Sequence, residues 1–122
     1  MRFTAETTHV PRSRRWVVGC AQRAGASAET LRVIALLTTE AVTNAVRHGP
    51  AGGEVEVSVT HRRDALRVTV RDQSPAAPIL RGAGPGSPDG RGVMLIDHLS
   101  TRWGVDHGPG TKAVWFEVPL RA

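Results

Sequence analysis

The fold is decided by one stretch of the chain, which reads Glu40-Ala41-Val42-Thr43-Asn44-Ala45-Val46-Arg47-His48-Gly49. It closes a longer segment that Ser27 can cap and Gly49-Pro50 can end, so we predict a helix over about 27–48. At ~100° per residue its apolar side chains gather on one side: Leu31, Ile34, Ala35, Ala41, Val42 and Ala45. Glu40, Asn44 and His48 are four residues apart, and we expect this polar line to face away from the centre of the apolar side.

The segments around this helix have the patterns of an α+β protein. We expect an edge strand within 2–7, a helix over 12–24, a hairpin formed by 54–60 and 66–71, a short helix over 92–99, and closing strands over 103–106 and 113–118. Both hairpin strands alternate apolar with polar residues, which is typical of strands with one buried face. We therefore predict an α+β two-layer sandwich, with one mixed, mostly antiparallel sheet and helices on one face.

A long segment without periodicity, Ser74 to Gly90, separates the hairpin from the short helix and is rich in proline and glycine. Loops of this length inside a compact domain are usually functional or disordered. We expect Gly90-Arg91-Gly92 to open the next helix, where backbone N–H groups and the helix dipole attract anions. The segment is not a P-loop, because no Gly-Lys-Ser/Thr sequence follows it.

Several polar residues have side chains suited to nucleotide chemistry. The amide oxygen of Asn44 can ligate Mg²⁺, and a glutamate one turn earlier can orient or deprotonate an attacking hydroxyl. Asp72 ends a predicted strand, where its carboxylate can accept a hydrogen bond from the exocyclic amine of adenine. The hydroxyl of Thr111 can reach the same base. Each residue alone also has a plainer interpretation, such as a solvated helix face or a turn.

The bulk composition fits a single globular domain over residues 1–122, with 40% hydrophobic and 22% charged residues. No apolar run approaches the ~20 residues that span a bilayer, and we expect no membrane association. The first residues lack the apolar core of a signal peptide, so we expect a cytoplasmic location, and the one cysteine, Cys20, fits a reducing compartment. The formal net charge of +5 favours acidic partners in general without choosing among them.

The stretch from Glu40 to Gly49 resembles the N box of the ATPase superfamily that joins gyrase, the heat-shock chaperone, histidine kinases and mismatch-repair proteins (GHKL). It is most similar to the anti-sigma-factor serine kinases of that superfamily. The similarity continues in the matches to the three glycine boxes, which are Asp72, Gly90-Arg91-Gly92 and Gly110-Thr111. In the first box this chain lacks the usual glycines and reads Asp72-Gln73-Ser74-Pro75-Ala76.

The resemblance spans about 27–119 and implies the Bergerat ATP-binding fold, with an ATP lid over about 74–91. It implies that Glu40 is the catalytic base and that Asn44 ligates Mg²⁺. It also implies that the following residues bind ATP: Asn44, His48, Asp72, Ser74, Gly90, Arg91, Gly92, Val93 and Thr111.

The function that the resemblance implies is that of a serine/threonine protein kinase acting on an anti-anti-sigma protein. Such a kinase would also bind a sigma factor and would form a homodimer. The alternative is a non-catalytic, ATP-sensing module that binds protein partners. Clusters of arginine suggest nucleic-acid binding as a third interpretation, but aromatic residues are only 4% of the chain and stacking platforms are therefore scarce, so we do not expect nucleic acid as a partner.

Overall fold

The computed structural model describes residues 1–74 and 88–121, and for 88–93 it describes the backbone alone. Along the chain the elements are β1 (Arg2–Thr4), α1 (His9–Arg23), α2 (Ala28–His48), β2 (Glu54–Arg62), β3 (Ala65–Asp72), α3 (Pro88–Leu99), β4 (Arg102–Gly108) and β5 (Thr111–Pro119). Every predicted helix and strand is present, with bounds that differ by a few residues. The predicted lid, about 74–91, falls largely outside the described residues.

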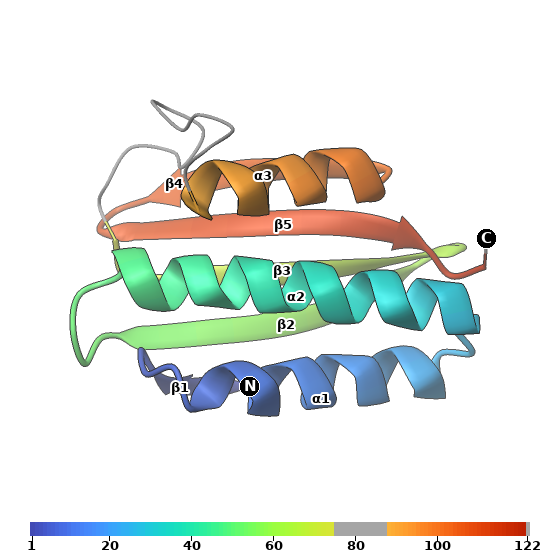
Figure 1. Cartoon of the computed structure of the whole chain (residues 1–122), viewed down its shortest axis with the longest axis horizontal. Helices are drawn as coiled ribbons and strands as arrows, with labels where there is room; N and C mark the ends of the chain where they lie inside the picture. The colour runs from blue at the N-terminus through green and yellow to red at the C-terminus, as the bar shows by residue number, and fades with distance from the viewer. Residues whose placement is uncertain (75–87, 122) are drawn as a thin grey trace.

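The described strands form one sheet in the order β1-β2-β3-β5-β4, and every neighbouring pair is antiparallel. All three helices lie on one face of this sheet, with α2 in the middle (Figure 1). The predicted α+β two-layer sandwich is confirmed, but the sheet is antiparallel throughout the described strands rather than mixed. Two-residue connections join β2 to β3 and β4 to β5, and connections this short can only join antiparallel strands.

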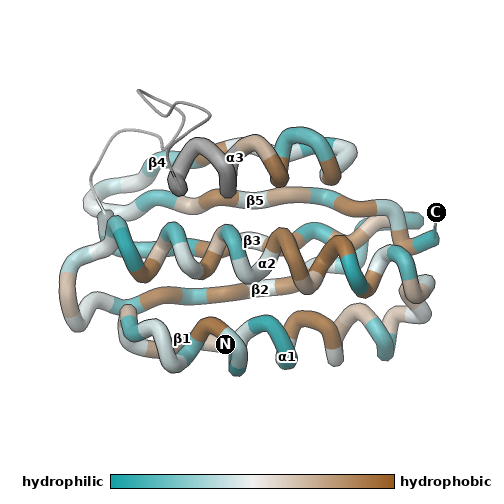
Figure 2. The backbone as a smooth tube through the Cα atoms, viewed as in Figure 1, coloured by the Kyte–Doolittle hydropathy of each residue, from teal (hydrophilic) through white to brown (hydrophobic). Residues whose placement is uncertain are grey.

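The core lies between the helices and the sheet. Alternate side chains of each strand point toward the helices. Among these, Val57 pairs with Val70, and Val68 pairs with both Val59 and Phe116 across the neighbouring strands. Figure 2 shows hydrophobic positions recurring along the strands and on the helices that cover them. Each fully buried side chain of this kind contributes about 1.5–3 kcal/mol of stability relative to an exposed one.

Helix α2 is fixed at its start by the end of β5. The Ser27 hydroxyl accepts a hydrogen bond from the Thr30 backbone N–H at 3.2 Å, as an N-cap should. The Thr30 hydroxyl donates to the carbonyl of Pro119 at 2.9 Å, and the Ser27 N–H donates to the carbonyl of Leu120 at 3.0 Å. The predicted cap is therefore confirmed, and it also attaches the helix to the sheet.

Helix α3 begins at Pro88, four residues before the predicted start at Gly92. Proline suits the first position of a helix because the N–H it lacks would have no partner within the helix. As a consequence, Gly90, Arg91 and Gly92 lie within the first turns of the helix, as the prediction that they open it implies, but the predicted first residue, Gly92, is wrong. Proline and glycine repeat through this part of the sequence, which hides the helical period.

The edges of the sheet carry polar contacts. At one edge, Arg2 Nε donates to Glu56 Oε2 at 2.7 Å, and this hydrogen bond, together with the charge of Glu56, raises the pKa of Arg2 above its usual value. The turn between the edge strand β4 and its neighbour β5 consists of Pro109 and Gly110, and Gly110 has a φ of 66°. A proline followed by a glycine of positive φ is the signature of a type II turn.

Among the described residues, no helix is both long enough and apolar enough to cross a membrane.

Candidate functional site

Several of the predicted site residues meet at one end of the molecule. The C-terminal end of α2, the end of β3, the start of α3 and the start of β5 all lie at the left end in Figure 1. Two close approaches support this arrangement: a Cβ added at Gly49 would lie 3.7 Å from the Cβ of Asp72, and Asp72 is the register partner of Lys112. The site is therefore built from segments that are far apart in the sequence.

Asn44 is the buried polar residue of α2 at this end. Its exposure is only 4%, and its side-chain amide has no hydrogen-bond partner among the described residues. The prediction that the polar line faces away from the core is wrong for this residue, because α2 packs against α1 on one side and α3 on the other. An uncommitted amide oxygen in a buried position is suited to bind a ligand or a hydrated cation.

Glu40 and His48 lie one turn to either side of Asn44, as predicted. Glu40 is half-buried and makes no hydrogen bond or ion pair with the described residues, whereas His48 is exposed at the end of α2. Glu40 thus combines partial burial with a free carboxylate, which is the combination that a general base needs.

Asp72 is buried at the end of β3, with an exposure of 2%. Its Oδ1 accepts a hydrogen bond from the Ser74 backbone N–H at 2.7 Å, and its Oδ2 lies 3.7 Å from Lys112 Nζ. Ser74 is also buried, at 1% exposure. These contacts fix the orientation of the carboxylate, and Lys112 supplies the opposite charge that a buried carboxylate requires.

Thr111 starts β5 and is half-buried. Strand alternation places its side chain on the open face of the sheet, whereas Lys112 is directed toward the helices. Lys112 rather than Thr111 is therefore the β5 residue that contacts the Asp72 carboxylate. Thr111 and Asp72 do border a common hollow of about 210 Å³ near the start of β5.

The backbone of 90–93 belongs to the first turns of α3. The first N–H groups of a helix have no partner within it, and because the helix starts at Pro88, the described residues that carry such free groups are Asp89 and Gly90. They are donors of the kind that phosphates bind at helix N-termini. Phosphate binding by this segment remains a prediction. The free N–H groups lie at the start of α3, at and just before Gly90.

The described residues contain no cluster of three or more histidine, cysteine, aspartate or glutamate side chains that could hold a metal ion by themselves. Mg²⁺ does not need such a cluster when triphosphate oxygens and waters complete its shell. The uncommitted amide oxygen of Asn44 fits this role, since a site for Mg²⁺ with a nucleotide requires few protein ligands.

The profile of the histidine kinase-like ATPase domain matches residues 3–118, which is nearly the whole chain. The chain belongs to this family. The predicted superfamily is thus confirmed, and family membership supports ATP binding, with kinase or ATPase activity as the class of chemistry.

Individual relatives agree with this assignment. An uncharacterized protein of Streptomyces coelicolor is 37% identical over 79 residues, which are 62% of this chain and 75% of that protein. The blue-light activated histidine kinase of Erythrobacter litoralis is 29% identical with a TM-score of 0.62, over 78% of this chain. This chain spans only 32% of that kinase. The catalytic domain of the histidine kinase ThkA is 13% identical with a TM-score of 0.64, over 100% of this chain and 99% of that one, and it shows the fold alone.

Lys112 is the residue of this ATPase domain that sequence reasoning missed as a site candidate. It is 1% exposed, and Asp72 is its only partner among the described residues. The alternation of β5 does indicate its burial, because Lys112 lies on the same face of the strand as the buried residues Val114, Phe116 and Val118. A lone lysine in a sequence is ordinarily taken as exposed, which concealed it.

Proposed function

We propose that this histidine kinase-like ATPase domain binds Mg-ATP at the end of the sheet where α2, β3 and α3 meet. The observation that carries the proposal is Asn44, a residue of only 4% exposure whose side-chain amide has no hydrogen-bond partner among the described residues. Asp72 lies at the same end and keeps its carboxylate oriented by a backbone N–H. An amide oxygen for Mg²⁺ and a fixed acceptor for the adenine amine are what such a nucleotide requires.

The other contacts complete the proposed site. Asn44 holds Mg²⁺, which neutralises charge on the phosphates. The N-terminal turn of α3, including Gly90, Arg91, Gly92 and Val93, holds phosphate oxygens. His48 and Ser74 contribute further contacts to the nucleotide, and Thr111 contributes one from the open face of the sheet, where it borders a hollow together with Asp72.

We further propose that the domain is a serine/threonine protein kinase. The acceptor hydroxyl oxygen attacks the γ-phosphorus of ATP, the bond from that phosphorus to the β–γ bridging oxygen breaks, and ADP leaves. Glu40, one turn from Asn44 and free of partners among the described residues, accepts the hydroxyl proton.

The proposed protein substrate is an anti-anti-sigma protein, and a sigma factor is the second partner. This step rests on the resemblance of the Glu40–Gly49 stretch to the anti-sigma-factor serine kinases. A cytoplasmic location and a homodimeric state belong to the same proposal.

A second candidate is an ATP-sensing module that binds partners without transferring phosphate. Two observations favour it. The ion pair between Lys112 and Asp72 already occupies part of the proposed base-reading carboxylate. The first glycine box also lacks its glycines, since Gln73-Ser74-Pro75-Ala76 follows Asp72. Both features favour weaker ATP binding and slower phosphate transfer.

Glu40→Gln distinguishes the two candidates, because it removes the base and keeps the size of the side chain. The kinase predicts that this variant binds Mg-ATP as the wild type does and loses phosphate transfer to anti-anti-sigma proteins of the same genome. Calorimetry measures the binding, and mass spectrometry of the acceptor protein measures the transfer. Wild-type protein that binds ATP but modifies no such acceptor would instead establish the sensing module.

A further inference from the structure

The face of the sheet opposite the helices carries an ordered set of charged side chains. On this face Arg67 of β3 stands opposite Glu117 of β5, which in turn stands opposite Arg102 of β4. Arg67 Nη2 lies 2.7 Å from Glu117 Oε2, and the Arg67 guanidinium also covers the Trp115 ring at 4.0 Å from its centroid. Glu117 and Arg102 of this row border a hollow at the end of the sheet.

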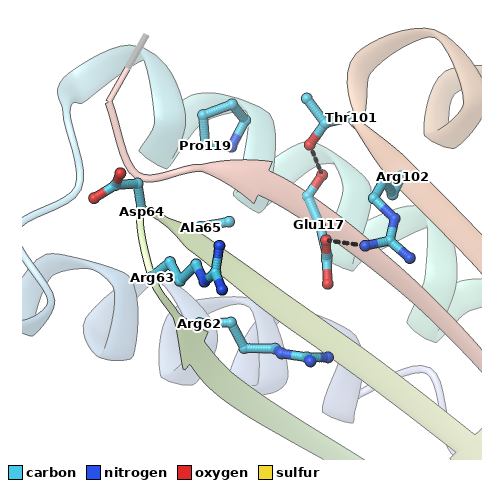
Figure 3. A pocket seen from close by; sticks show the side chains of 8 residues that line it. All are labelled: Arg62, Arg63, Asp64, Ala65, Thr101, Arg102, Glu117 and Pro119. Atoms are coloured by element: carbon cyan, nitrogen blue, oxygen red, sulfur yellow. Dashed lines mark hydrogen bonds and ion pairs between the residues drawn. The ribbon is translucent and has the colours of Figure 1, made fainter.

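The hollow has a volume of about 540 Å³ and lies where the β2–β3 turn meets the start of β4 (Figure 3). Its floor is low because Ala65 and Pro119, which are register partners, carry short side chains. Arginines stand around this floor: Arg62 from β2, Arg63 from the turn and Arg102 from β4 (Figure 3). Short residues surrounded by long cationic ones produce a depression with a positive border.

The positive charge of this border is not balanced locally. Arg62 and Arg63 make no ion pair or hydrogen bond with the described residues. Glu117 faces the hollow but is already paired with Arg67, and its contact with Arg102 Nη1 is longer, at 3.8 Å. The carboxylate of Asp64 points away from the arginines (Figure 3). The guanidinium groups of Arg62 and Arg63 thus lack anionic partners among the described residues, and that of Arg102 has only a distant one.

Arg63 adds a conformational observation. Its φ is 54°, the only positive φ of a non-glycine residue in the described part of the chain. This left-handed region favours glycine and asparagine, and arginine there costs free energy. Strained residues of this kind cluster at functional sites. The turn therefore holds an arginine at a position where glycine or asparagine would be more stable.

We propose that this hollow is a binding site for an acidic segment of a partner protein, with carboxylates of the segment paired to Arg62, Arg63 and Arg102. The three arginines come from different elements around a space larger than one small anion, so an extended chain with several carboxylates matches them better than a single phosphate does. Arginine is well suited to this role because its guanidinium binds carboxylates in a bidentate fashion.

Nucleic acid fits this surface less well. The face of Trp115 is covered by Arg67 and offers no stacking platform to a base. The hollow also lies at the opposite end of β3 from Asp72, roughly 23 Å away at ~3.3 Å per residue, so it is separate from the proposed nucleotide site.

The test uses the full chain and a peptide of alternating glutamate and serine, with the peptide in which glutamine replaces glutamate as its control. The double variant R62Q/R63N removes two charges, and asparagine at 63 tolerates the left-handed φ. R15Q/R32Q makes the same change in net charge on exposed residues of α1 and α2. Calorimetry should show that R62Q/R63N weakens binding of the acidic peptide at least about tenfold, while R15Q/R32Q leaves it within about twofold.

Nuclear magnetic resonance provides the second measurement. The acidic peptide should shift the amide signals of Ala65, Thr101 and Glu117 and leave those of α1 unchanged. The proposal is overturned by equal weakening in both double variants, by equal binding of the glutamine peptide, or by absence of binding to the wild type. It is also overturned if inorganic phosphate or a DNA oligonucleotide binds the hollow more tightly than the peptide.

Discussion

At the scale of single residues, two buried polar side chains distinguish the candidate site from an ordinary domain core. Asn44 is uncommitted among the described residues, and Lys112 has Asp72 as its one partner there. These two residues need different explanations. A free amide is available for a ligand. Buried charges, in contrast, need opposite charges within the protein, and Lys112 and Asp72 supply these to each other without a ligand.

The Lys112–Asp72 pair should make the stability of the domain strongly dependent on both partners. Lys112→Met leaves the Asp72 carboxylate buried without a counter-charge, and we expect it to lower the free energy of unfolding by about 3–5 kcal/mol. Asp72→Asn in the Lys112→Met background removes that charge and should recover part of the loss. Urea unfolding of the two single variants and the double variant measures the coupling. Additive losses would show that the pair does not interact.

At the scale of elements, α2 contributes both the core face and the site residues, so its position relative to the sheet matters for function. That position depends on contacts at its first turn, where Ser27 and Thr30 attach it to the end of β5. The site residues lie at the other end of the same helix. Because α2 is one continuous helix, the contacts at its first turn also fix the position of Asn44 near its last turn.

Removal of the N-cap tests this element directly. Ser27→Ala should lower the free energy of unfolding by about 0.5–2 kcal/mol, because the Thr30 N–H loses its side-chain acceptor. Ser58→Ala, on an exposed position of β2, is the matched control and should change stability by no more than about 0.5 kcal/mol. Equal losses in the two variants would mean that the cap contributes nothing specific.

At the scale of the whole molecule, period-2 and helical patterns were sufficient for the element order and the two-layer architecture. Alternation in the hairpin and the Ser27 cap were reliable because each depends on local geometry alone. The burial of Asn44 was not predictable from a helical wheel, since α1 and α3 flank α2 and a single helix does not reveal its neighbours. Lys112 was missed because its partner Asp72 is forty residues away in sequence, and only the register of β3 and β5 joins them.

The start of α3 was missed for another physical reason. Proline and glycine are common there, and they signal a loop unless proline occupies the first helical position, as Pro88 does. The register also explains how Arg102 comes to border the same hollow as Arg62 and Arg63, from which it is about forty residues away in sequence. Arg62 and Arg102 come from separate hairpins and meet only because β3 and β5 pair between them.

The measurement that tests the central claim most directly is calorimetry of ATP binding, with Mg²⁺ and with a chelator, for the wild type, Asn44→Ala and the neighbouring control Thr43→Ala. We predict that the wild type and Thr43→Ala bind ATP in a Mg²⁺-dependent manner and that Asn44→Ala abolishes this binding while remaining folded. No binding by the wild type at millimolar ATP, or undiminished binding by Asn44→Ala, would contradict a Mg-ATP site at this end of the sheet.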